Sequence, residues 1–171
     1  RFNATAVGKT ITPSTSNFYN LLFDSSSGGW TITANATSTN NTTITNASTL
    51  TLASGATLEV DGTFTNSVGG GSTTWTGSTL YLNSGTTYSI NTKAAGGDSY
   101  STLLIGASTK VSSWDSSAEV TTVNSTGSLY SQDHAGTSGA LNIYGAYTRS
   151  TGTDYWSRTT DFDGTDISGS P

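Results

Sequence analysis

The sharpest candidate for chemistry is a group of aspartates near the C-terminus, Asp161, Asp163 and Asp166, with a glycine between the last two. Carboxylates at alternate positions beside a glycine bend can converge on a hard cation such as calcium, which prefers oxygen ligands. Asp154 could add a further ligand. The distal Glu of an EF-hand loop is missing, so the pattern also fits a solvated turn with Phe162 buried. The sequence therefore offers calcium as the one cofactor to consider, against an ordinary acidic turn.

Two other groups of polar residues could support hydrolysis. Glu59 and Asp61 alternate in one expected strand, and clustered acids of this kind serve as proton donor and base in polysaccharide-degrading enzymes. A similar phrase later in the chain has Ser89 and Asn91 at the matching places, which favours solvent-facing positions. The only histidine, His134, has no nucleophile-elbow phrase to supply a serine. We therefore predict no catalytic residue and no enzyme.

Aromatic rings offer a binding chemistry, because flat amphipathic rings stack well on sugar faces. The chain has four tryptophans, Trp30, Trp75, Trp114 and Trp156. Trp30 and Trp75 fall at the starts of expected strands, where closing a narrow core is the commoner role. Triplets that match the glycosylation pattern begin at Asn3, Asn35, Asn41, Asn46 and Asn124. In a chain this rich in Asn and Thr such triplets arise by chance, so a glycan is an alternative partner without assigned residues.

The bulk composition excludes several classes of function. The 171 residues are 32% hydrophobic and only 10% charged, with a net charge of −5. An acidic chain with scattered cations does not suit nucleic acid or anionic membranes. Cysteine is absent, and no apolar run is long enough to span a membrane. Position 1 is not methionine, which predicts a processed chain or an excised piece. The composition, poor in charged residues and free of thiols, predicts an extracellular or cell-surface setting.

A repeated phrase organises the expected secondary structure. Residues 49–60 read TLTLASGATLEV, residues 79–90 read TLYLNSGTTYSI thirty positions later, and residues 121–130 are a looser echo. Alternating apolar and polar residues around a Ser-Gly turn predict short strands with one buried face. Repetition at a fixed offset predicts a parallel β-helix, or β-solenoid, of short stacked coils with little or no helix. The alternative is a β-sandwich or jelly roll, in which hairpins would pair antiparallel.

We expect one all-β domain over residues 1–171. Residues 1–17 form an N-terminal strand that could contact another subunit, residues 18–148 form the solenoid, and residues 149–171 form a C-terminal tail.

Four phrases along residues 10–92 carry a family resemblance: FYNL at 18–21, GGWTI at 28–32, NNTTIT at 40–45 and LTL at 50–52. This string resembles the β-helical repeats of large secreted bacterial surface proteins of the adhesin-like or autotransporter-like kind. Residues 93–171 look like the same proteins. The resemblance implies an extracellular or cell-surface parallel β-helix with a structural or adhesive role, and no catalytic motif comes with it.

These observations predict a non-enzymatic building block of a surface fibre, filament or adhesin. The end coils of a solenoid present unpaired backbone groups, and a head-to-tail contact between unlike ends does not close on itself. The expected partners are copies of the same chain or neighbouring modules of a longer one. The residues assigned to this contact are Phe2, Val7 and Ile11 at one end, docking near Leu141, Ile143 and Tyr147 at the other. The alternative function is a carbohydrate-binding or polysaccharide-degrading β-helix.

Overall fold

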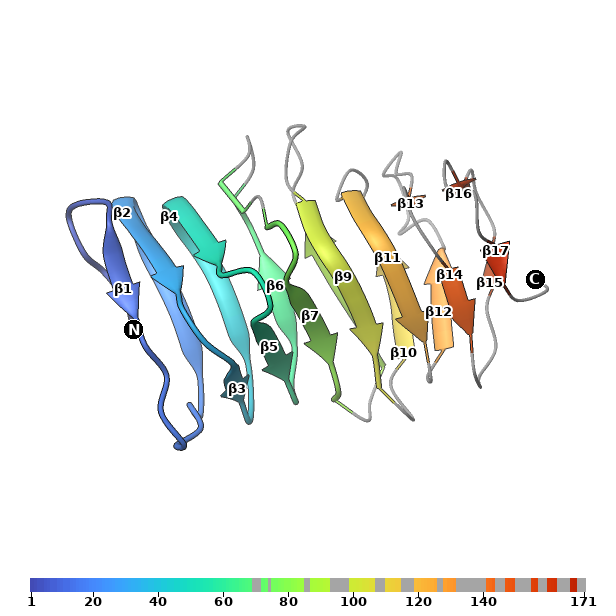
Figure 1. Ribbon diagram of the computed structural model, residues 1–171, viewed down its shortest axis with the longest axis horizontal. Helices are drawn as coiled ribbons and strands as arrows, with labels where there is room; N and C mark the ends of the chain where they lie inside the picture. Colours follow the sequence, from blue (N-terminus) through green and yellow to red (C-terminus); the bar gives the residue numbers. More distant parts are fainter. Residues whose placement is uncertain are drawn as a thin grey trace.

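The computed structural model is a β-solenoid, and every strand pair among its described residues is parallel (Figure 1). It describes residues 1–68, 72–73, 75–84 and 99–106, together with the later strands and β8; side chains are described up to residue 84 and over 101–106. The strands are β1 (Lys9–Ile11), β2 (Leu21–Ile32), β3 (Ala36–Ser38), β4 (Thr42–Leu52), β5 (Thr57–Val60), β6 (Phe64–Asn66), β7 (Thr79–Leu82), β8 (Thr87–Thr92), β9 (Ser99–Ile105), β10 (Lys110–Trp114), β11 (Glu119–Ser125), β12 (Ser128–Ser131), β13 (Leu141–Ile143), β14 (Tyr147–Arg149), β15 (Tyr155–Trp156), β16 (Thr160–Phe162) and β17 (Ile167–Ser168). The described residues contain no helix.

The strands form two sheets that run the length of the molecule. One has eight strands in the order β1-β2-β4-β6-β8-β10-β12-β15, and the other has nine, with the path β16-β13-β11-β9-β7-β5-β3 and β14 and β17 beside it. Each coil therefore gives strands to both sheets before the chain steps up to the next coil. Leu58 pairs with Leu80, so the stretch of chain between these two residues is one coil. The predicted solenoid is confirmed, and the sandwich alternative is wrong because the strand pairs are parallel.

The thirty-residue repeat is not the repeat of the solenoid. Leu50 lies in β4 and pairs with Trp30 in the eight-stranded sheet, whereas Leu80 lies in β7 and pairs with Leu58 in the nine-stranded sheet. The two similar phrases thus occupy different sides of their coils. Two strands are also much longer than the short strands that the sequence predicts: β2 has 12 residues and β4 has 11, and both turn a corner where their register shifts.

The core is a narrow column of side chains between the sheets. In the nine-stranded sheet, two inward ladders run through successive coils: Ala36, Leu58, Leu80 and Leu103 in one, and Ser38, Val60, Leu82 and Ile105 in the other. All eight side chains are buried. The eight-stranded sheet adds larger side chains, including Phe23, Trp30 and Phe64, and Trp75 comes from the connection between β6 and β7; all four are buried.

Residues 1–11, here called the N-terminal layer, lie along β2. The Phe2 ring stacks on Phe23 with centroids 5.1 Å apart, and the amide of Phe2 donates to the carbonyl of Leu22. Gly28 makes this close approach possible, because a Cβ there would lie 2.6 Å from the carbonyl oxygen of Ala4. The expected N-terminal strand is β1, which pairs along β2. Beyond residue 149, strands β15, β16 and β17 continue the sheets by pairing with β12, β13 and β14.

Polar side chains close the corners between coils. The Asn20 side-chain oxygen accepts a hydrogen bond from the amide of Asn41, and the Asn41 side-chain oxygen accepts one from the amide of Thr63. Such bonds satisfy backbone groups where the chain leaves the sheet. In the part of the chain that the structure describes, no helix is long and apolar enough to cross a membrane.

Candidate functional site

The acids predicted from the sequence lie where β5 ends. Glu59 is an outward-facing residue of β5, between the buried Leu58 and Val60. Its carboxylate accepts a hydrogen bond of 2.9 Å from the Asn83 amide and one of 3.4 Å from the Thr37 hydroxyl. The three residues come from three successive coils, so Glu59 ties neighbouring coils together on the outside of the sheet.

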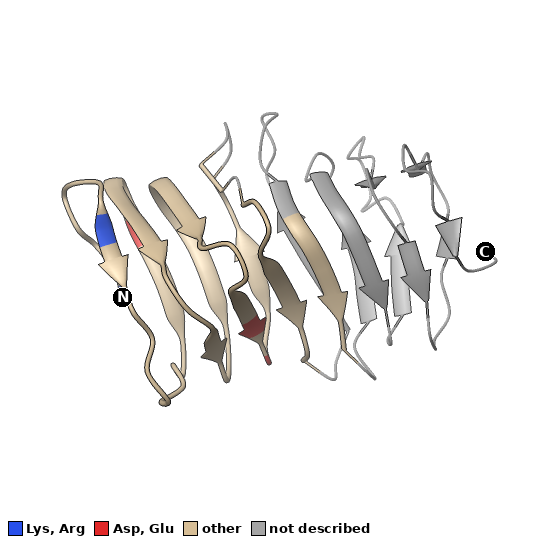
Figure 2. Ribbon diagram, in the orientation of Figure 1, with Lys and Arg blue, Asp and Glu red and all other residues tan. Residues whose placement is uncertain are grey.

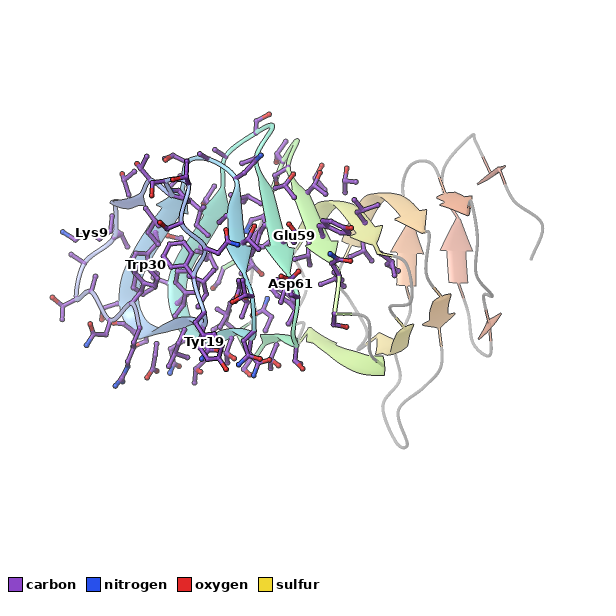
Figure 3. The ribbon with its side chains drawn as sticks, turned by 90° about the horizontal axis from the view of Figure 1, so that it is seen from below. Lys9, Tyr19, Trp30, Glu59 and Asp61 are labelled. Carbon is purple, nitrogen blue, oxygen red and sulfur yellow. The ribbon has the colours of Figure 1, made fainter. Side chains whose placement is uncertain are left out.

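Asp61 lies beside Glu59 (Figure 3). Its Oδ1 is buried and has no hydrogen-bond partner. Burial raises the pKa of Asp61, the charge of Glu59 raises it further, and the Asn83 amide opposes the rise. In this pair the Glu59 carboxylate is hydrogen-bonded, and the Asp61 carboxyl ionises less readily than usual. A polysaccharide-degrading groove would add further acids, and the described residues contain no group of three or more His, Cys, Asp or Glu side chains.

Charged residues are sparse over the described surface (Figure 2). Among the residues with described side chains they are Arg1, Lys9, Asp24, Glu59 and Asp61. Arg1 and Asp24 form an ion pair of 2.6 Å, and the Asn46 amide donates to the other oxygen of Asp24. The Asn46 hydrogen bond, followed by the Arg1 interactions, lowers the pKa of Asp24 despite some burial.

The C-terminal candidates are only partly placed. Asp161 lies in β16, where it pairs with Asn142 of β13. Asp154, Asp163, Asp166 and His134 lie outside the described residues, so the calcium site stays a prediction.

The assembly residues are spread over both ends. Phe2 and Ile11 pack in the N-terminal layer, and Val7 is 59% exposed. Leu141 and Ile143 lie in β13, which pairs with β11 and β16, and Tyr147 lies in β14, which pairs with β11 and β17. Each of these two strands thus has a strand neighbour on both sides.

Two of the four tryptophans are core residues. Trp30 and Trp75 are 3% and 2% exposed, and the Trp75 indole donates a hydrogen bond of 2.7 Å to the carbonyl of Leu50. They are therefore not available for stacking on a sugar. Trp114 and Trp156 lie in β10 and β15, and their side chains are outside the described part. The exposed aromatic side chain of the described part is Tyr19, at 71% (Figure 3).

A feature that reasoning from the sequence did not find is a regular set of threonines along β1, β2 and β4. Thr10 pairs with Thr31, and Thr31 pairs with Thr51, so one outward column is threonine in three successive coils. The next outward column holds Thr12 and Thr33, and the Thr33 hydroxyl lies 3.1 Å from that of Thr12. We call these five residues the threonine array. The signal was present as TIT at 10–12 and again at 31–33, one coil later, followed by TLA at 51–53.

An open groove of about 490 Å³ borders the array. It is formed by the turns that follow β1, β2 and β4, at residues 13–14, 33–35 and 54–56. Its sides are hydroxyl, amide and small apolar groups, without a charged residue. The groove and the array form one neutral surface across three coils.

The chain matches no family model, no curated protein and no solved structure.

Proposed function

We propose that this chain is a non-enzymatic structural module of an extracellular or cell-surface fibre, filament or adhesin. The observation that carries the proposal is the continuity of its side-chain ladders, which extend from Ala36 to Ile105 in one sheet. In such a stack each coil adds about 4.8 Å of length and is bound to the next by parallel backbone hydrogen bonds. The product of this architecture is a stiff rod.

The neutral surface supports the same role. Outside the core the described side chains are mostly Thr, Ser and Asn, and only five are charged. Hydroxyls and amides keep the rod hydrated, while the corner asparagines and Glu59 bond one coil to the next. A polar exterior that is itself part of the coil-to-coil bonding suits a rod whose task is mechanical.

We place the end-to-end contact of the proposed assembly at β1. This strand is the edge of the eight-stranded sheet, and a parallel strand from another copy or from a neighbouring module would extend it. Lys9 is in register with the buried Trp30 and Leu50, so its charge lies at the end of a core column. A charge at such an edge position opposes strand addition. Lys9 therefore sets how strongly this end associates.

Electron microscopy and sedimentation velocity test this proposal over a range of protein concentrations. Filaments one solenoid wide are expected for the natural chain, and Lys9→Leu should polymerise at lower concentration because the core column then ends in an apolar side chain. Thr10→Leu is the matched control, since it alters the neighbouring outward position and should leave assembly unchanged. Monodisperse monomers of both the natural chain and Lys9→Leu would contradict the end-to-end assembly.

A further inference from the structure

We propose that the threonine array and its bordering groove bind the surface of ice. This function is separate from the structural role above and depends on a different part of the molecule. The array lies along the side of the solenoid, whereas the proposed assembly contact lies at its end.

The array repeats in two directions. Thr10, Thr31 and Thr51 follow one another across paired strands, which are about 4.8 Å apart, while residues two apart along a strand are about 6.6 Å apart. Thr12 and Thr33, each directly after the end of its strand, occupy the second column, where the Thr33 hydroxyl lies within hydrogen-bond distance of the Thr12 hydroxyl and of the Ile11 carbonyl. Four of the five array side chains are exposed, and Thr31, in the middle, is half-buried among them. Hydroxyl groups are therefore presented on a grid whose repeats are similar in size to those of the oxygen lattice in ice.

Threonine is well suited to hold such a grid. Its branched side chain has few accessible rotamers, so the hydroxyl and the methyl keep fixed directions on a strand. The hydroxyl can donate to and accept from water, and the methyl leaves neighbouring water no partner on that side. Each bond to water contributes little by itself. A rigid grid makes several at once without ordering flexible groups, which is the main cost of binding.

The other outward columns differ from the array in composition or in exposure. On the nine-stranded sheet one outward column reads Thr37, Glu59, Tyr81 and Leu104. On the other part of β2, β4 and β6 the column reads Leu22, Thr43 and Thr65. Threonine favours exposed strand positions in general, and that preference would act on every side of the coil. Both of these columns include apolar or charged residues. A third outward column, Thr57, Thr79 and Thr102 on the nine-stranded sheet, is threonine in three coils, but all three side chains are half-buried, whereas Thr10 and Thr51 of the array are exposed.

The form of the surface points to a lattice rather than to a soluble ligand. Small molecules are usually enclosed in concave pockets, and the groove beside the array is wide open. A repeating surface is complementary to a repeating partner. Crystalline polysaccharide is the other partner of this kind, but its sugar rings are bound by exposed aromatic side chains. The array contains no aromatic residue, and the two tryptophans of the described core are buried.

The experiment is to measure thermal hysteresis and ice-crystal shaping with the purified chain. Faceted crystals and a measurable hysteresis are expected, and Thr51→Lys should abolish both because a long charged side chain then projects from the array surface. Thr45→Lys is the matched control, since Thr45 is also an exposed residue of β4 but lies outside the array. It should keep the activity of the natural chain.

Thr51→Val guards against an effect of Lys on folding, because it keeps the shape of the side chain and replaces only the hydroxyl with a second methyl. It should lower the hysteresis while leaving the thermal melting curve unchanged. Round ice crystals without hysteresis for the natural chain would overturn the proposal. Equal activity of Thr51→Lys and Thr45→Lys would also overturn it, as would binding to microcrystalline cellulose without any effect on ice.

Discussion

One inward ladder of β3, β5, β7 and β9, here called the aliphatic ladder, holds aliphatic residues in each described coil, whereas one inward column of β2, β4 and β6, here called the mixed column, changes from coil to coil. The aliphatic ladder runs Ala36, Leu58, Leu80, Leu103, and all four are buried aliphatic side chains. In the mixed column Leu21 pairs with Thr42, and Thr42 pairs with Phe64. Where the residues of a column are similar, each side chain fills the core volume of its own coil. Where they differ in size, a small side chain in one coil must be offset by a large one nearby.

The inward columns of the eight-stranded sheet also bury polar atoms. Asn66 pairs with Ile44 and is fully buried, and its amide donates a hydrogen bond of 2.8 Å to the Thr73 hydroxyl. Thr42 is fully buried too, and its hydroxyl oxygen has no hydrogen-bond partner. The described ladders of the nine-stranded sheet have a single buried polar residue, Ser38, whose hydroxyl donates to the carbonyl of Asn41. We infer that the aliphatic ladder contributes more to the free energy of unfolding than the mixed column, because the mixed column buries a polar group at a cost.

The largest effect is expected from Leu80→Ala in the aliphatic ladder. Leu80 is fully buried between Leu58 and Leu103, so truncation removes contacts to both neighbouring coils and leaves a cavity. We expect a loss of about 3 kcal/mol in the free energy of unfolding. Denaturant unfolding followed by circular dichroism measures it.

The matched truncation is Ala56→Gly, at a buried position where no large side chain is removed. It should cost about 1 kcal/mol or less, mostly through backbone entropy. An equal loss of unfolding free energy for Leu80→Ala and Ala56→Gly would show that packing along the ladder adds no stability beyond that of an ordinary buried position.

A smaller effect of opposite sign is expected from Thr42→Val in the mixed column. Valine has nearly the shape of threonine and removes the buried hydroxyl that lacks a partner. We expect the free energy of unfolding to rise by about 1 kcal/mol. The comparison variant is Thr73→Val, which removes the hydroxyl that Asn66 bonds and should be destabilising by a similar amount. If Thr42→Val also destabilises the protein, its hydroxyl is satisfied in solution and the contrast between the sheets weakens.

The sequence was sufficient for the fold class but not for the register. Alternation of Leu with Thr marks strands, and the turn residues mark their ends, so an all-β solenoid was predictable. Alternation cannot say which side of a coil a strand occupies, because Leu50–Leu52 and Leu80–Leu82 have the same pattern in different sheets. The true period was visible in ATLEV at 56–60, STLYL at 78–82 and STLLI at 101–105, which follow one another coil by coil. These short phrases match less well, but they occupy equivalent positions in successive coils. The longer phrase that repeats after thirty residues does not.

The candidate surfaces were predictable to different degrees. The neighbouring positions of Glu59 and Asp61 follow from strand alternation, and so does the burial of Trp30. The bond between Glu59 and Asn83 depends on the register of the coils, so the thirty-residue repeat could not place it. The threonine array was missed for the same reason, since its three rows align only when the sequence is offset by one coil. Where a site is built from several coils, the register decides which residues meet.

The smallest effect concerns the outside of the aliphatic ladder, where Asp61 and Asp24 should respond to pH with opposite signs. Burial, followed by the charge of Glu59, raises the pKa of Asp61 in the folded state. Between about pH 3.9, the ordinary pKa of Asp, and the raised pKa of Asp61, the folded state therefore binds more protons than the unfolded chain. Stability falls over this window. The pKa of Asp24 is lowered by Asn46 and Arg1, so its contribution is present above the ordinary value and is lost as the pH falls.

Replacing each aspartate with asparagine separates the two contributions. Asp61→Asn removes a carboxylate that ionises at a cost, so it should raise the free energy of unfolding at pH 7 by less than about 1 kcal/mol. At pH 3 the two proteins should have the same stability, because Asp61 is then protonated. Asp24→Asn should lower stability at pH 7 and have little effect at low pH. Thermal melts of freshly prepared protein between pH 3 and pH 7 measure both, and a stability difference for Asp61→Asn that does not change with pH would mean that the Asp61 carboxylate is not strained by its surroundings.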